Sequence, residues 1–343
     1  MKKLLLIALF LTPHTGLLFA QSGGYAGEFS RLGFAPRGIA MGNALSAVSV
    51  PGSYAYYNPA LSAIPADDIQ IDISTAALAF DRRLHMAGIR IPLPPSAGLS
   101  FTLLNARVSD IDGRTTDGYH TGMLGIAEYQ LLGNFAIRLT ENVWTGIGIK
   151  YNHGDYHQQI PAATGIGLDA GILVRFSPNF QAAITLKDLL ASFEIDSSEL
   201  YGTDQALNNT QSFPVRSILG ISWQPAERWL VSQDIELRFS SYNRLTGEVV
   251  DRNGFDIPIT LRENQKDRSA FFRTGAQFEI HERFTLRSGL ELVDAGGENI
   301  FQPAFGFSIH LPFDTYSPAI DYAIRREPGR ISTMHVFAIR LDI

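Results

Sequence analysis

Hydrophobic and polar residues alternate with a period of two along most of the chain after residue 65. Residues 69–74 place three isoleucines at alternate positions with polar residues between them, and residues 235–239 alternate Ile, Leu and Phe with charged residues. Successive side chains of a strand point to opposite faces, so each stretch predicts a strand with one apolar and one polar face.

The same alternation predicts fourteen strands. Most of them are long enough to cross a bilayer when tilted, which takes roughly nine to eleven residues. Their predicted ranges are 69–80, 84–92, 97–108, 128–139, 143–153, 164–176, 180–188, 214–223, 228–240, 268–280, 284–293, 303–311, 315–325 and 331–343.

The connections between these strands alternate between short turns and longer loops, the longest spanning 109–127, 189–213 and 241–267. A soluble β-sandwich also alternates apolar and polar residues, with the apolar face as its core. Short turns on one side and long loops on the other are typical of an outer-membrane barrel. The even strand number and a last strand that runs to the final residue favour the same interpretation. We therefore predict an all-β fold, a fourteen-stranded antiparallel transmembrane β-barrel over residues 67–343.

The first twenty residues have the layout of a secretory signal peptide. Lys2 and Lys3 precede an apolar run, and cleavage is expected after Ala20. The formal net charge of −6 comes from 28 basic against 34 acidic residues, so losing both lysines leaves −8. An acidic chain argues against nucleic acid as a partner.

Residues 33–65 are rich in Gly, Ala and Ser, carry three tyrosines, and have Arg37 as their only charge. A segment this small and apolar is suited to packing in a confined space, so residues 21–66 are predicted to fold into the lumen as a plug, with a short helix over 38–48. A lone buried cation requires a partner. The candidate lumen-wall carboxylates are Asp169, Asp234, Glu236 and Glu291.

In-strand glycines allow close backbone approach. The small residues 38–44 are therefore expected to lie against the wall at Gly146, Gly148, Gly165 and Gly167. The other inward positions carry charges of both signs. They fit either a polar channel or a filling of salt bridges, and the mixture of signs favours the filling.

No motif for catalysis stands out. Serine is absent from any nucleophile-elbow context, and the chain has no cysteine for thiol chemistry or metal binding. His153, Asp155 and His157 alternate near a strand end, but two histidines in a loop are a weak metal signal. We expect no enzyme activity, no metal site and no cofactor.

Two short motifs carry a resemblance to a known family. The first contains Arg37, Gly38, Met41 and Gly42, and the second contains Asn58-Pro59 followed by Ala-Leu. In this order and spacing, with later runs such as 112–114 and 168–171, the chain resembles the PorV/PorQ outer-membrane proteins of the FadL-like group from about residue 24 to 343. Many relatives have an acidic pair where this chain has Val50-Pro51-Gly52. We therefore do not assign to this chain any role that the acidic pair has in those relatives.

The resemblance implies a place in the bacterial outer membrane, with outer-membrane lipid around the barrel. It also implies transport or secretion, in particular a shuttle or attachment role in type IX secretion with secreted proteins or secretion components as partners. The alternatives are a FadL-like channel for hydrophobic small molecules and a structural barrel without substrate.

Overall fold

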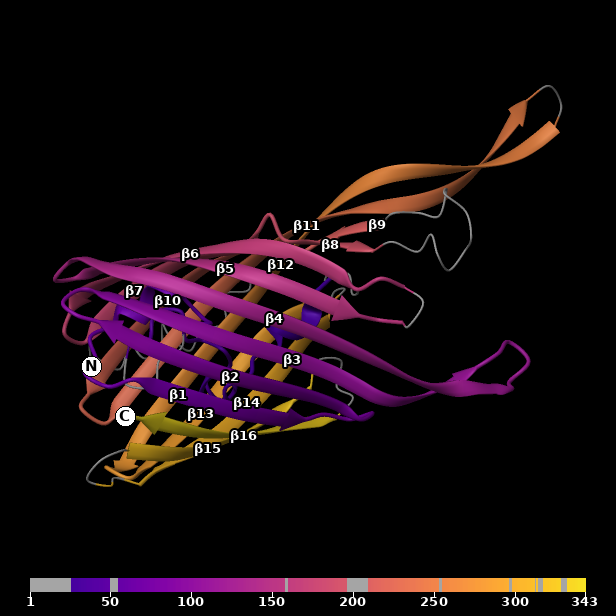
Figure 1. Ribbon diagram of the computed structural model, residues 1–343. Helices are drawn as coiled ribbons and strands as arrows, with labels where there is room; N and C mark the ends of the chain where they lie inside the picture. Colours follow the sequence, from indigo (N-terminus) through magenta and orange to yellow (C-terminus); the bar gives the residue numbers. More distant parts are fainter. Residues whose placement is uncertain are drawn as a thin grey trace.

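The computed structural model is a closed antiparallel β-barrel with long hairpins at one end (Figure 1). It describes residues 26–49, 55–157, 160–195, 209–252, 255–295, 298–311, 313, 317–327 and 332–343. The predicted signal peptide, residues 1–20, lies outside the described residues.

Fourteen strands form the barrel, as the alternation predicts. Strands β1 to β7 pair in chain order, β7 pairs with β10, β10 to β16 follow in order, and β16 pairs with β1 to close the ring. The barrel strands are β1 (Gln70–Ala77), β2 (Arg82–Leu93), β3 (Ala97–Arg114), β4 (His120–Thr140), β5 (Val143–Asp155), β6 (Ala163–Ser177), β7 (Phe180–Leu189), β10 (Val215–Ala226), β11 (Trp229–Arg252), β12 (Phe255–His281), β13 (Phe284–Ala295), β14 (Glu298–His310), β15 (Ser317–Arg326) and β16 (Thr333–Asp342).

The two faces of the strands separate by polarity. Outward residues such as Ile73, Ile147 and Phe337 are 53 to 61% exposed, whereas inward Asp72 and Ser74 are 3% exposed. The wall is therefore apolar outside and polar inside over most of its circumference, which is the inverse of a soluble domain.

Two of the predicted long loops are largely strand. β11 and β12 stay in continuous register from Trp229↔Phe278 to Arg252↔Phe255, and their hairpin projects far beyond the barrel (Figure 1). β3 and β4 likewise continue to residue 114 and from residue 120. The sequence places Asn253-Gly254 between β11 and β12. That dipeptide strongly favours a two-residue hairpin turn, and the prediction of a loop overlooked it.

The predicted loop 189–213 contains a second departure. Residues Ser192–Ile195 (β8) and Asn209–Ser212 (β9) form a small hairpin, and β8 contacts β6 at Thr164↔Glu194. We call the rim that carries this hairpin and the long hairpins the long-loop end, and the opposite rim the short-turn end.

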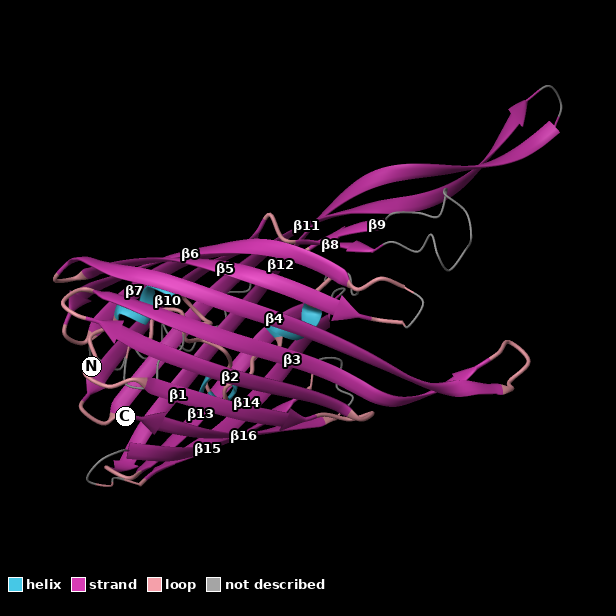
Figure 2. Ribbon diagram, viewed as in Figure 1, coloured by secondary structure: helices cyan, strands magenta, loops and turns pink. Residues whose placement is uncertain are grey.

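Three short helical turns precede the first strand: η1 (Glu28–Arg31), α2 (Pro36–Ala40) and η2 (Pro59–Ala63). They lie inside the outline of the barrel (Figure 2). Among the described residues, no helix has both the length and the apolar character needed to cross a membrane.

Candidate functional site in the barrel lumen

The N-terminal segment, residues 26–49 and 55–64, runs through the lumen and is almost entirely buried. Ala26 belongs to an apolar cluster at the long-loop end with Phe193 of β8 and with Phe213, which directly follows β9. η2 contacts strands β2 to β6 near their short turns. The segment therefore extends from one end of the lumen to the other.

The first sequence motif packs against bare backbone. Gly42 has a φ of +63°, and a Cβ added there would lie 2.8 Å from the backbone N and O of Leu290. A Cβ on Gly275 of β12 would meet the Cβ of Met41 at 2.8 Å. Glycine on both sides allows chain and wall to approach this closely, and the left-handed φ separately favours glycine at position 42.

This contact corrects two predictions. The helix ends at Ala40 rather than near residue 48, because Gly42 and Asn43 both have positive φ and turn the chain. The glycines that face residues 40–42 belong to β12, β13 and β14, not to β5 and β6. They are Gly275, Gly289 and Gly306.

The predicted wall glycines have other neighbours. Gly146 lies against Pro59, so it does serve the N-terminal segment, but at the second motif. Gly148 lies beside Asn134, and Gly165 and Gly167 accommodate the chain at residues 191–192.

The second motif anchors the short-turn end of the segment. Asn58 caps η2 by accepting a 3.0 Å hydrogen bond from the Ala60 backbone N–H through Oδ1. Its Nδ2 donates to the carbonyl of Ser46 at 2.9 Å. Pro59 follows at the first position of η2, where its fixed φ suits a helical turn. One asparagine therefore links two parts of the segment.

Arg37 is buried and donates through Nη2 to Oε1 of Gln277 at 3.0 Å. Among the four candidate carboxylates, Asp234 binds the segment, but at Ser46. Its Oδ2 accepts from the Ser46 backbone N–H at 3.0 Å and its Oδ1 accepts from Ser46 Oγ at 2.8 Å. A carboxylate contact for Arg37 stays a prediction.

The other three carboxylates belong to buried ion pairs of the wall. Asp169 lies 2.7 Å from Lys150 Nζ. Glu236 and Glu291 share Arg273, with N···O distances of 2.6 and 2.5 Å. These pairs confirm the expected salt-bridged filling, in which charges of opposite sign neutralise each other inside the barrel.

Asp188 is a wall residue that the sequence did not single out. It is fully buried, has a φ of +60°, and binds Lys150 Nζ at 2.6 Å and Arg216 Nε at 2.7 Å. Its own backbone N–H donates to Asp169 Oδ1 at 2.9 Å. Lys187 beside it donates to the Tyr56 carbonyl. The irregular part of β7 around Asp188, where its register with β6 shifts, therefore connects the charged wall to the N-terminal segment.

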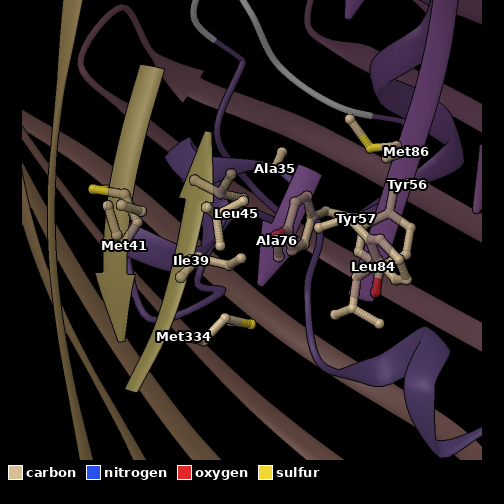
Figure 3. Close-up of a cluster of buried hydrophobic side chains, with 14 of the residues drawn as sticks. Ala35, Ile39, Met41, Leu45, Tyr56, Tyr57, Ala76, Leu84, Met86 and Met334 are labelled. Carbon is tan, nitrogen blue, oxygen red and sulfur yellow. The ribbon is translucent and has the colours of Figure 1, made fainter. Parts of the chain in front are cut away.

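The opposite part of the wall is apolar toward the long-loop end, whereas Asp72, Arg90 and Arg340 of the same strands are buried nearer the short-turn end. Inward side chains of β1, β2, β3 and β16 form one cluster with the N-terminal segment (Figure 3). The wall contributes Ala76, Leu84, Met86, Leu104, Met334 and Val336, and the segment contributes Phe34, Ile39, Met41, Leu45, Tyr56 and Tyr57. Toward the long-loop end the lumen is therefore asymmetric, with a charged side and an apolar side.

Two cavities around Tyr56, one toward Arg216 and Glu236 and one toward Asp72 and Arg90, each measure about 20 Å³. This is about the space of a single water molecule.

The long-loop end of the lumen is covered by aromatic contacts. Phe193 and Phe213 pack edge to face at 5.0 Å, and Tyr156 packs on Phe193 at 6.3 Å. Desolvation by burial raises the pKa of the Tyr156 phenol, whose hydroxyl hydrogen-bonds Glu128 Oε1 at 3.2 Å.

Within the part of the chain that the structure describes, no three His, Asp or Glu side chains are grouped to hold a metal ion.

Several lumen residues left no signal in the sequence, notably Ser46, Gln277 and Ser222. Ser222 Oγ donates to the Ala47 carbonyl at 2.8 Å. Small polar residues at inward strand positions are common, so only the fold reveals which of them hold the segment. The in-strand glycines of β12 and β13 were a usable signal that pointed to a close approach.

No family model matches the sequence, and no curated protein matches it. Solved structures share its fold. The Ralstonia pickettii toluene transporter TbuX is 13% identical with a TM-score of 0.60, covering 92% of this chain and 98% of that one. The Pseudomonas putida toluene transporter TodX is 13% identical with a TM-score of 0.59, covering 95% of this chain and 98% of that one. A Pseudomonas aeruginosa FadL homologue is 11% identical with a TM-score of 0.57, covering 95% of this chain and 99% of that one.

At these identities the likeness establishes the fold. It supports the FadL-like part of the predicted resemblance at that level. The narrower resemblance to PorV and PorQ stays a prediction.

Proposed function

We propose that this protein is an outer-membrane channel for hydrophobic small molecules, held closed by its N-terminal segment acting as a plug. It is a transport protein of the bacterial outer membrane and has no enzymatic chemistry. This is the alternative that the sequence left open beside a secretion role.

The apolar side of the lumen carries this proposal. A water-filled pore has a polar interior, yet inward Leu84, Met86 and Leu104 are 0 to 4% exposed and packed against aromatic and aliphatic side chains of the segment. If the segment moves aside, this wall offers an apolar compound the contacts that the segment makes now.

The outer surface supports the placement in a membrane. Outward Leu219, Ile235 and Phe305 are 42 to 58% exposed. Large apolar side chains exposed around a whole barrel are unfavourable in water and favourable against lipid. The proteins of similar structure include two toluene transporters and a monoaromatic hydrocarbon channel, which agrees with an apolar cargo.

The test is the uptake of an apolar dye by cells that express the protein. N-phenylnaphthylamine should enter faster than in cells with an empty vector, while a charged β-lactam should not. Met86→Gln together with Leu84→Ser should reduce dye uptake, because both place polar groups on the apolar wall. Ser232→Ala, on the charged side, is the matched control. Equal uptake of the dye with and without the protein would contradict the proposal.

The type IX secretion role stays a prediction from the sequence resemblance alone. Its partners would be secreted proteins or secretion components that contact the projecting β11–β12 hairpin. Loss of secreted cargo from the cell surface, with dye uptake unchanged, in a strain lacking the hairpin residues 243–264 would support it.

A further inference from the structure

Two arginines stand side by side on the outer face of the barrel near the long-loop end. Arg83 of β2 pairs in register with Arg107 of β3, and both side chains are exposed. Like charges directly opposite each other on neighbouring strands repel. Within the described residues, neither guanidinium has an ion-pair or hydrogen-bond partner.

The nearest acid in the same cross-strand row does not relieve this repulsion. Arg107 pairs with Ala127, which pairs with Asp155. Two strand spacings place that carboxylate about 10 Å away. An anion bound between the arginines would be stabilised by both.

A polar row lies two residues closer to the short-turn end. Thr75, His85 and Asn105 are in register across β1, β2 and β3, and Thr75 Oγ1 lies 3.1 Å from His85 Nδ1. All three side chains are on the outward face, where most neighbours are apolar. They add hydrogen-bonding groups directly beneath the arginines.

This row lines one end of a mostly apolar groove of about 600 Å³, which continues below it. Its floor is low because Ala87 has a small side chain, and Ile73 and Leu103 are its register neighbours on either side. Phe337 and Ile320 extend the lining toward β15. Apolar groove, polar row and paired cations therefore follow one another along the strand direction.

We propose that this surface binds a phosphate-bearing lipid of the outer leaflet. Its acyl chain would lie in the groove over Ala87, and its phosphate would lie between Arg83 and Arg107, with His85 and Asn105 as further hydrogen-bonding groups. This arrangement matches the orientation of a lipid in a membrane. The charged groups lie toward the long-loop end, where the headgroup would be, and the groove lies toward the bilayer centre, where the acyl chain would be.

The experiment is native mass spectrometry of the full-length protein in detergent, titrated with dioleoyl phosphatidic acid. The double variant Arg83→Gln, Arg107→Gln should bind about twenty-five-fold more weakly, because each arginine near an anionic lipid contributes about a factor of five. Ala87→Phe, which fills the groove, should also weaken binding. Dioleoylglycerol, which lacks the phosphate, should bind the unchanged protein poorly.

Arg268→Gln with Arg283→Gln is the control, because it removes the same charge from β12 and from the turn between β12 and β13, and it should leave binding unchanged. Equally weakened lipid binding in this control would show that binding depends only on the overall charge of the protein, and it would overturn the proposed site. Competition by inorganic phosphate at concentrations equal to the lipid would show a free-anion site and overturn the lipid assignment. Unchanged dye uptake in the double variant would keep this result separate from the channel proposal.

Discussion

At the scale of single residues, missing side chains position the N-terminal segment. Gly42, Gly275 and Gly289 bring two backbones together where any side chain would hold them apart. In-strand glycines were visible in the sequence, and close approach was the expected consequence. Which glycines would face the segment depended on the path of the chain across the lumen, and the alternation pattern contains no information on that path.

Gly42→Ala should loosen the segment. The left-handed φ costs an L-residue about 1–2 kcal/mol, and the new Cβ would also press on backbone atoms of Leu290 and Thr274. We expect ion current across a planar bilayer to rise above that of the unchanged protein. Gly118→Ala introduces the same kind of backbone strain at φ +87°, but its new Cβ would have no atom within 4 Å. This control variant should therefore leave the ion current unchanged. An equal rise in ion current for Gly42→Ala and Gly118→Ala would contradict the role of the contact between Gly42 and the wall.

Asp234→Asn should have a related effect through hydrogen bonding. Both carboxylate oxygens accept from Ser46, and an amide group can accept through only one atom. Losing a buried bond to a charged group costs about 1.5–3 kcal/mol. Limited proteolysis in detergent should cut the segment faster in this variant. Asp68→Asn, at an exposed position before β1, should leave the cleavage rate unchanged.

At the scale of elements, the strands were largely predictable and their ends were not. A period of two identifies a strand wherever one face meets lipid and the other the lumen. Beyond the barrel rim neither face has a fixed environment, and in β11 the alternation is lost after Phe239. β12 still alternates Phe255, Ile257, Ile259 and Leu261 with other residues, but the sequence prediction did not use that run. Their extension depends on pairing with each other, and the turn dipeptide Asn253-Gly254 was its sequence signal.

Leu237→Arg should impair assembly because Leu237 faces outward on β11 and is 41% exposed. An arginine at mid-bilayer depth costs about 2–4 kcal/mol. The measure is the fraction of protein that runs as a compact band on an unheated SDS gel. Leu311→Arg, next to the short-turn end and 38% exposed, should cost much less, since cost falls toward the interface. Equal losses would mean that these two positions do not differ in membrane depth.

At the scale of the whole molecule, the architecture followed from the rhythm of turns and loops, and the interior did not. Charges of both signs predicted a neutralised filling, and the ion pairs confirm it. The apolar side of the lumen was hidden in the sequence, because inward Leu84 and Met86 alternate with exposed residues just as lipid-facing ones do. Only the closed ring shows which face of β2 is the inside.

Deleting residues 33–65 should leave a barrel that still inserts but conducts ions as an open channel. The described part of the segment occupies the lumen, and the two cavities around Tyr56 measure only about 20 Å³ each, so the intact protein should conduct little. Planar-bilayer recording of both forms is the measurement, with heat-shifted gel mobility as the check on folding. Large currents through the intact protein would show that this segment does not close the barrel.

The path of the N-terminal segment also has a consequence for the order of folding. α2 contacts β13 to β16, while η2 contacts β2 to β6, so one short segment touches both ends of the strand sequence. Ring closure joins Gln70 to Asp342, about 270 residues apart, and such long loops are slow to close. A segment bound to both halves acts as an internal template. Refolding in detergent should therefore produce the compact gel band more slowly for the deleted chain than for the intact one.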